Sequence, residues 1–257
     1  MAYTIAIAGK GGTGKTTLTG LLITYLASTG KTPILAVDAD ANANLNEVLG
    51  VEIEMTLGGL RESIKNAEYD KNDPIPETMT KQDFLNIKFA DAITEEDDYD
   101  LLVMGRTQGQ GCYCYANGLL KAHLQKYSNN YKYIVVDNEA GMEHISRGVL
   151  PGIDLIIIVS DCSRRGVQAA ARIKELVAEL DMKIADGIKL IINKAPDGVL
   201  NEGITEEIEK HNFDLAGVVP ADELVYEYDS NGTPTSSLPE SSPARSAVTK
   251  IFASIIR

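Results

Sequence analysis

The sequence predicts an α/β fold in which a doubly wound, mostly parallel sheet carries helices on both faces. Apolar runs of strand length recur along the 257 residues, and most are rich in Ile, Val and Leu without alternation. Such runs are typical of strands that are covered on both faces. Helical patterns separate the runs, and this repeated strand–helix order indicates parallel strands. A glycine-rich segment between the first run and the first helix is the third observation.

Each element follows from its local pattern. The expected strands are 3–8, 33–37, 100–104, 133–137, 155–160, 188–193 and 215–219. The expected helices are 16–28, 117–127, 165–180, 205–211 and 243–256, the last with Ser242 as N-cap and Pro243 in its first position. Residues 56–67 also have a helical pattern. Residues 50–99 otherwise break the alternation, and we interpret them as an irregular insertion in a single domain that spans 1–257. The acidic run at 94–100 is interpreted as a solvated loop.

Residues 9–17, GKGGTGKTT, match the phosphate-loop pattern G-x-x-x-x-G-K-[ST] between a strand and a helix. Glycines let the backbone turn tightly, so that N–H groups point at an anion where the helix dipole also favours negative charge. Lys15 is expected at the β- and γ-phosphates and the Thr16 hydroxyl at Mg²⁺. The sequence therefore predicts a P-loop NTPase fold that binds ATP or ADP with Mg²⁺. The residues assigned to this ligand are Gly11, Gly12, Thr13, Gly14, Lys15, Thr16 and Thr17.

A second lysine, Lys10, follows the first glycine of the loop. The loop thereby resembles the deviant phosphate loop of the nitrogenase iron protein and MinD family of dimeric ATPases. The resemblance implies that Lys10 reaches across a homodimer to the partner's nucleotide. A cation there stabilises charge on the transferred phosphoryl group, as an arginine finger does.

Carboxylates close two of the expected strands. Asp38 and Asp40 follow the second strand, and Asp137 ends the apolar run IVVD. Carboxylates at the carboxyl ends of such strands face the ligand crevice, which suits Mg²⁺ and an attacking water. The resemblance implies that Asp40 activates the water with Asp38 as its neighbour. It also makes Asp137 the Walker B carboxylate and Gly141 the sensor of the γ-phosphate.

Two further strand ends carry polar or loop residues. Asn193 has the donor and the acceptor that match the edge of a base, and Lys194 follows it. The resemblance places this pair, and the loop Pro220, Ala221 and Asp222, around the adenine. A Pro after a strand is also compatible with an ordinary loop.

The pair Cys112 and Cys114 lies in a glycine-bearing segment before the helix expected at 117. A nearby helix N-terminus favours thiolates, which bind Zn²⁺, Ni²⁺ and Cu⁺. Two ligands do not fill a four-coordinate site, but two copies in a C₂ dimer do. We therefore expect a Cys₄ site shared between protomers and linked reciprocally to ATP-driven dimerisation. The alternative is a pair of ordinary buried cysteines. Cys162 is interpreted as a core or crevice residue, and the histidines His123, His144 and His211 as surface or capping residues.

Most of the chain resembles the CooC-type nickel-insertion ATPases, which mature carbon monoxide dehydrogenase and the related acetyl-CoA synthase. The resemblance implies an ATPase that dimerises with nucleotide and delivers nickel to one of these enzymes. An Fe–S carrier ATPase and a partitioning or positioning switch ATPase stay open as alternatives. The segments that carry the resemblance are the loop 9–17, DADAN at 38–42, MGRTQGQGCYC at 104–114, VVDNEAGMEH at 136–144 and INK at 192–194.

Composition excludes several other partners from the prediction. The net charge of −13 argues against wide contact with nucleic acid, which needs a basic face. The N-terminus has no signal-peptide pattern. No stretch approaches 18 consecutive apolar residues, and the expected last helix has few basic residues, so no membrane role is expected. We expect a cytoplasmic protein.

Overall fold

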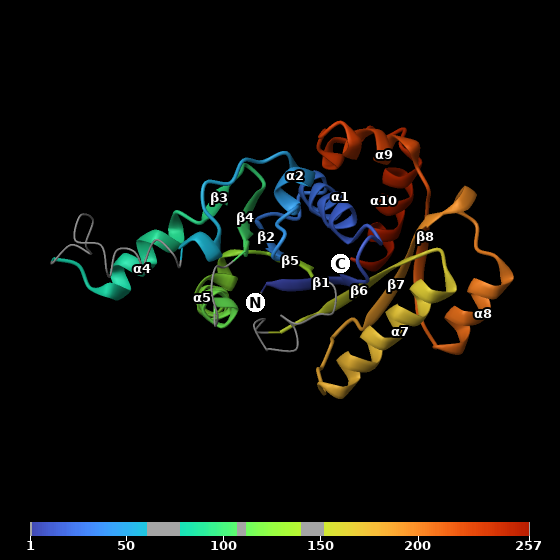
Figure 1. The fold of residues 1–257 in the computed structure, drawn as a ribbon, viewed down its shortest axis with the longest axis horizontal. Helices are drawn as coiled ribbons and strands as arrows, with labels where there is room; N and C mark the ends of the chain where they lie inside the picture. Colours follow the sequence, from blue (N-terminus) through green and yellow to red (C-terminus); the bar gives the residue numbers. More distant parts are fainter. Residues whose placement is uncertain (1, 61–77, 107–111, 140–151, 257) are drawn as a thin grey trace.

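The computed structural model has one eight-stranded sheet that is parallel except at one edge (Figure 1). The structure describes residues 2–60, 78–106, 112–139 and 152–256. The order of the strands is β3-β4-β2-β5-β1-β6-β7-β8, with β3 antiparallel to β4. Together with the helices on its two faces, this sheet confirms the predicted fold class. The strands are β1 (Tyr3–Gly9), β2 (Ile34–Ala39), β3 (Ile93–Glu95), β4 (Tyr99–Val103), β5 (Tyr133–Asn138), β6 (Leu155–Asp161), β7 (Ile188–Ala195) and β8 (Asp214–Pro220).

The strand order reverses at β1. The chain first runs outward from β1 to β2 and β4, then returns through β5 and continues on the other side of β1 through β6, β7 and β8. Ligands of such sheets bind outside the carboxyl ends of the strands, near the point of reversal. The loop that follows β1 lies at this point, and it is the phosphate loop.

Helices cover both faces of the sheet (Figure 1). On one face, Ile5 and Ile7 share a buried cluster with residues of α1 and α10. On the other face, Ala6 and Ala8 pack with α7 and α8, and α5 packs over β2, β4 and β5. Alternate residues of β1 therefore serve both layers. The helices are α1 (Lys15–Ser28), α2 (Leu45–Leu49), α4 (Lys81–Ala90), α5 (Cys112–Tyr127), α7 (Arg164–Glu179), α8 (Glu202–Lys210), α9 (Glu223–Ser230) and α10 (Pro243–Ile255).

Several predicted boundaries were wrong. Helix α5 begins at Cys112 and not near 117, because no proline or glycine between 112 and 116 interrupts it. The run 94–100 is not a plain loop, since β3 ends and β4 begins in it as a tight hairpin, with a hydrogen bond from Glu96 N to Tyr99 O of 2.9 Å. Its acidic residues suit an edge strand, where charge discourages further pairing. The short helices α2, α4 and α9 were not predicted.

Helix α10 was predicted correctly down to its cap. Ser242 Oγ accepts a hydrogen bond from the backbone N–H of Arg245, and Pro243 occupies the first turn. In the region predicted as an insertion, 57–60 are helical and α4 precedes β3. Residues 61–67 of the helical pattern lie outside the described residues. None of the described helices combines the length and the apolar character needed to cross a membrane.

Candidate functional site

The loop between β1 and α1 gathers donors around a single oxygen. The Lys10 carbonyl accepts from Thr13 Oγ1 at 2.9 Å and from Thr13 N at 3.4 Å. The Lys15 ammonium, which is buried, lies 3.4 Å from the same oxygen. The Thr13 N–H, the Thr13 hydroxyl and the Lys15 ammonium thus gather at the N-terminal end of α1, where an anion is favoured. Gly14, at φ 90°, ends the loop and starts α1.

Asp38 and Asp137 lie side by side, because β2 and β5 pair in a register that sets them opposite each other. Burial raises the pKa of Asp137 to about 7; a hydrogen bond from the Thr16 hydroxyl opposes the rise, and the nearby Asp38 adds to it. Asp137 Oδ1 is buried and has no hydrogen-bond partner within the described parts of the chain. Buried polar atoms are rarely left without a partner, so this oxygen calls for a ligand.

Among the residues that the structure describes, Asp38 has hydrogen-bond partners on both oxygens, unlike the neighbouring Asp137. Its Oδ1 accepts from Asp40 N at 3.0 Å, and its Oδ2 accepts from Leu45 N at 2.9 Å. The carboxylate is fully buried, and this burial raises its pKa against those hydrogen bonds. Asp38 therefore shapes the loop that follows β2.

That loop carries Asp40 and reaches the cysteine-bearing segment. Asp40 Oδ1 accepts from Asn42 N at 2.8 Å, and the Asp40 side chain is half-buried. Asn42 Oδ1 in turn accepts from Arg106 Nη2 at 2.8 Å. Arg106 stands six residues before Cys112. Sequence reasoning assigned no role to this exposed arginine, because no local pattern shows which loop it contacts.

The residues present fit Mg²⁺. The Thr16 hydroxyl and the unpartnered oxygen of Asp137 are hard oxygen donors, which Mg²⁺ prefers. They lie beside Lys15 at the start of α1, where phosphates would supply the remaining negative charge. Thr16 and Asp137 are therefore the residues here that could hold the metal, whereas Asp38 shapes the loop beside it.

A cavity of about 320 Å³ lies next to the phosphate loop, between α1, the ends of β7 and β8, α9 and α10. Its size is that of a small-molecule pocket. The predicted residues Gly14, Thr17, Asn193 and Lys194, with Pro220, Ala221 and Asp222, all line it. Sequence reasoning missed the part of the wall that α9 provides, including Val225 and Tyr226, because it did not predict that helix.

Asp222 lines the cavity, but its carboxylate is already occupied. Its Oδ1 accepts from Leu224 N at 2.9 Å, and its Oδ2 accepts from Ala244 N at 3.0 Å and Ser242 Oγ at 2.6 Å. Burial favours the neutral acid, yet these hydrogen bonds together lower the pKa of Asp222. One side chain thus ties the start of α9 to the start of α10, and Pro220 and Ala221 are left to offer backbone to a base.

The structure describes some of the remaining predicted residues and leaves others outside its described ranges. Lys10 is exposed at the rim of the loop. The backbone of Cys112 and Cys114 forms the first turn of α5. Gly141 and His144 lie outside the described residues. His123 is a correction: it is neither a surface residue nor a cap but is buried and stacked on Phe89, with ring centroids 4.3 Å apart, and burial lowers its pKa to about 4.

Comparison with known proteins identifies the family. The CobQ/CobB/MinD/ParA nucleotide binding domain matches residues 4–235. The chain belongs to this family. As a member of the CobQ/CobB/MinD/ParA family it is an ATPase, and nucleotide with Mg²⁺ is the ligand that this membership supports.

Individual relatives cover almost the whole chain. An uncharacterized ATP-binding protein of Methanocaldococcus jannaschii is 41% identical over 252 residues, 98% of each chain. The carbon monoxide dehydrogenase accessory protein CooC of Rhodospirillum rubrum is 33% identical over 236 residues, 89% of this chain and 87% of its own. The septum site-determining protein MinD of Pyrococcus horikoshii, solved with Mg-ADP, has a TM-score of 0.72 at 21% identity, over 100% of this chain and 97% of that one. This last likeness shows the fold.

Proposed function

We propose that this ATPase is a metallochaperone that dimerises with nucleotide and delivers nickel to carbon monoxide dehydrogenase or acetyl-CoA synthase. Support comes from the likeness to CooC, which spans most of both chains, and from the pair Cys112 and Cys114. The observation that carries the proposal is structural: the Arg106–Asn42 hydrogen bond joins the loop after β2 to the segment that leads into these cysteines. This hydrogen bond supports a link between the loop beside the phosphate site and the proposed metal site.

The hydrolytic half of the cycle uses the residues around the phosphate loop. The N–H groups of residues 11–17 and the Lys15 ammonium bind the phosphates, and Asn193, Lys194, Pro220 and Ala221 border the base. Thr16 and Asp137 would hold Mg²⁺, which would neutralise negative charge on the phosphates. Asp40 orients and deprotonates the attacking water, and the partner subunit's Lys10 approaches the γ-phosphate. The position of Asp40 depends on Asp38, whose carboxylate accepts from the backbone N–H groups of Asp40 and Leu45.

The metal half of the cycle follows from the same loop. ATP closes the dimer and brings two copies of Cys112 and Cys114 together as four thiolates for Ni²⁺, the cargo. Loss of the γ-phosphate releases the loop at 38–44 and the segment that contains Gly141, the thiolate pairs separate, and Ni²⁺ passes to the client enzyme. Loss of γ-phosphate contacts is a known driver of such order changes.

The test is Ni²⁺ binding by the reduced protein, measured by equilibrium dialysis together with light scattering after gel filtration. Samples contain no nucleotide, ADP or a non-hydrolysable ATP analogue, and Zn²⁺ is measured in parallel. We expect about one Ni²⁺ per dimer, retained in Cys162→Ala and lost in Cys112→Ala/Cys114→Ala. Cys162 is the matched control, because it is a free cysteine remote in sequence from the pair.

Two results would overturn the proposal in different ways. Dimers that form with nucleotide but bind no Ni²⁺ through the cysteines would contradict nickel delivery and favour a positioning switch ATPase. An absorption spectrum typical of an Fe–S cluster after anaerobic iron reconstitution, with no Ni²⁺ bound, would favour a cluster carrier.

A further inference from the structure

Two side chains of β7 make hydrogen bonds to the phosphate loop, although the two segments lie about 180 residues apart in the sequence. Asn193 Nδ2 donates to the Thr13 carbonyl at 2.9 Å. Lys194 Nζ donates to the Gly12 carbonyl at 3.0 Å. Neighbouring residues of one strand thus hold neighbouring carbonyls of the loop. Asn193 is buried with 6% of its surface exposed, so its amide is fixed against the loop, while the Lys194 ammonium reaches the loop from the exposed side.

A regular strand does not make such a pair of contacts, because successive side chains point to opposite faces. The pairing of β7 with β8 is irregular at this point. Ile192 is paired with Val218 and Ala195 with Pro220, so β7 has one more residue than β8 between the two pairs. Lys194 adopts φ 57°, a left-handed conformation that is unusual for a residue with a side chain. A bulge re-aims side chains in this way, and bulges are enriched next to active sites.

The two contacts fix the direction of the loop's N–H groups. Within a planar trans peptide the C=O and the following N–H point in opposite directions. A Gly12 carbonyl held by Lys194 therefore turns the Thr13 N–H away from β7, and a Thr13 carbonyl held by Asn193 does the same for the Gly14 N–H. The Thr13 N–H does point toward the loop's interior, where it meets the Lys10 carbonyl.

The glycine at position 14 belongs to the same arrangement. A Cβ built on Gly14 would lie 2.4 Å from Asn193 Nδ2, and the residue has φ 90°. A side chain at 14 would displace the Asn193 amide and strain the backbone at once. The loop and the bulge are thus shaped to each other.

We propose that Asn193 and Lys194 are positioning residues that hold the phosphate loop in its anion-binding conformation. Their contribution applies to any polyphosphate, whether or not it carries a base, and it goes beyond the role in base binding that the sequence predicted. It depends on the phosphate loop alone, so it stands or falls separately from nickel delivery.

The test separates a role at the loop from a role at the base. Magnesium tripolyphosphate has no base, and its affinity is measured by competition with a fluorescent ADP analogue, beside the affinities of ATP and ADP. We expect Lys194→Gln to weaken tripolyphosphate and ATP by the same factor, about tenfold, the equivalent of one charge-assisted hydrogen bond. Lys194→Arg should restore most of the loss. Lys189→Gln, which removes a surface ion pair of the same strand with Asp214, is the matched control and should bind as the wild type does.

A ligand-free measurement completes the test. Hydrogen exchange of the amides at 12–14 should accelerate in Lys194→Gln and stay unchanged in Lys189→Gln at equal thermal stability. A fall in ATP affinity with unchanged tripolyphosphate affinity and unchanged exchange would assign Lys194 to the base and overturn the proposal. Unchanged exchange and unchanged affinity for every ligand would overturn it as well, because the Lys194 contact with the loop would then be dispensable.

Discussion

The nucleotide site and the interface between α7 and α8 each bury a carboxylate. The two carboxylates differ in how many of their hydrogen bonds are made. Asp137, at the end of β5, is 2% exposed and leaves Oδ1 without a hydrogen-bond partner among the described residues. Glu207, on α8, is also 2% exposed, but both of its oxygens are engaged. Burial raises the pKa of Asp137 to about 7, whereas the Arg164 hydrogen bond and further partners lower that of Glu207 to about 2.

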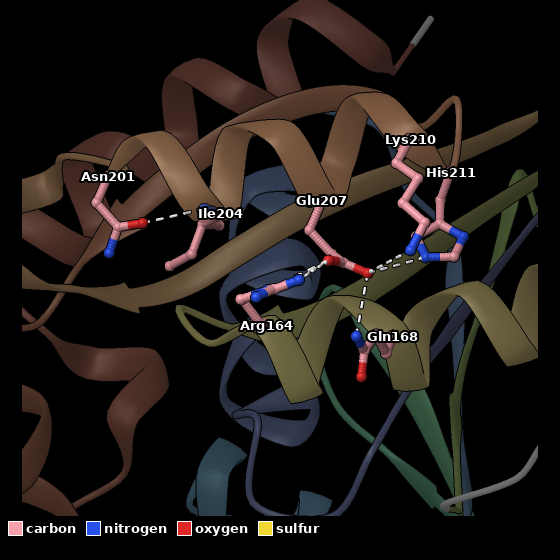
Figure 2. A network of polar contacts seen from close by, with 7 residues as sticks. All are labelled: Arg164, Gln168, Asn201, Ile204, Glu207, Lys210 and His211. Atoms are coloured by element: carbon pink, nitrogen blue, oxygen red, sulfur yellow. Dashed lines mark hydrogen bonds and ion pairs between the residues drawn. The ribbon is translucent and has the colours of Figure 1, made fainter.

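Figure 2 shows how complete the set of partners around Glu207 is. Arg164 of α7 approaches Oε2 with Nη2 at 3.0 Å and Nε at 3.2 Å. Oε1 accepts from Gln168 Nε2 at 3.1 Å and lies 3.2 Å from His211 Nε2 and 3.7 Å from Lys210 Nζ. Two helices and the residue that ends α8 therefore meet at one carboxylate. It has no oxygen left for a ligand.

This contrast shows how a buried carboxylate with a structural role can be distinguished from one with a functional role. A buried carboxylate with all its hydrogen bonds made joins elements of the fold, and removing a partner leaves a charge unpaired. A buried carboxylate with an oxygen unmet is poorly suited to stability and is instead suited to a cation or a substrate. Substitution should therefore affect activity at Asp137 and stability at Glu207.

The largest effect should come from Asp137→Asn. We expect ATP hydrolysis to fall roughly 100-fold, a loss typical of removing one preorganised electrostatic contact to the reacting phosphates. The melting temperature of the nucleotide-free protein should not decrease, because the neutral amide avoids the desolvation that raises the pKa of Asp137. Steady-state phosphate release and calorimetry measure the two quantities. Equal losses of activity in Asp137→Asn and Glu207→Gln would contradict the division into a functional Asp137 and a structural Glu207.

A second effect should appear at the contact that joins the two proposed sites. Arg106 and Asn42 make an exposed hydrogen bond of 2.8 Å, which contributes little to stability. If the proposed nickel site is coupled to nucleotide, an ATP analogue should raise Ni²⁺ affinity roughly tenfold, a coupling of ordinary size. We expect Arg106→Gln to keep its melting temperature and to lose most of that gain. Asn42→Ala should lose the same share, and the double variant should lose no more than either single one. Additive losses would show that the two residues act independently.

Much of this fold was accessible from local patterns. The strands of the parallel sheet were predicted because β1, β5 and β6 are continuous apolar runs, and the phosphate loop because its glycines and Lys15 have fixed spacing. Contacts between distant segments were not accessible. Nothing near Asn193 shows that a bulge turns it toward Thr13. Nothing near Asp222 shows that it caps α9 and also accepts from Ala244 N in the first turn of α10.

Helix starts were missed for a related reason. Asn is a favourable N-cap residue, so the helix was expected to begin near Asn117. Helix α5 instead begins at Cys112, because the residues from 112 to 116 tolerate a helix. The Glu207 network was also invisible, since its members are ordinary surface types at 164, 168, 207, 210 and 211 in the sequence. Packing of α8 on α7 alone makes them a cluster.

A smaller effect, on stability only, should follow from Glu207→Gln. Arg164 and Lys210 would keep their charges without the carboxylate that neutralises them. We expect the melting temperature to fall by about 5 °C with ATP hydrolysis unchanged at 25 °C. The matched control is Asp214→Asn, which breaks the ion pair of an exposed carboxylate with Lys189 and should change the melting temperature by less than about 1 °C. Loss of activity in Glu207→Gln at a temperature where it is folded would assign this network a functional role.

The smallest effect is confined to acid pH. Because the folded pKa of Glu207, about 2, lies below the ordinary value of 4.5, this group stabilises the fold fully above about pH 4.5 and loses that contribution as pH falls toward 2. The groups that face the carboxylate are cationic or neutral: Arg164, Lys210, His211 and Gln168. Urea unfolding between pH 5 and pH 2.5 should therefore show a steeper loss of stability in the wild type and in Asp214→Asn than in Glu207→Gln. Parallel curves for all three would mean that the carboxylate titrates alike in the folded and unfolded chains, and the contrast with Asp137 would rest on activity alone.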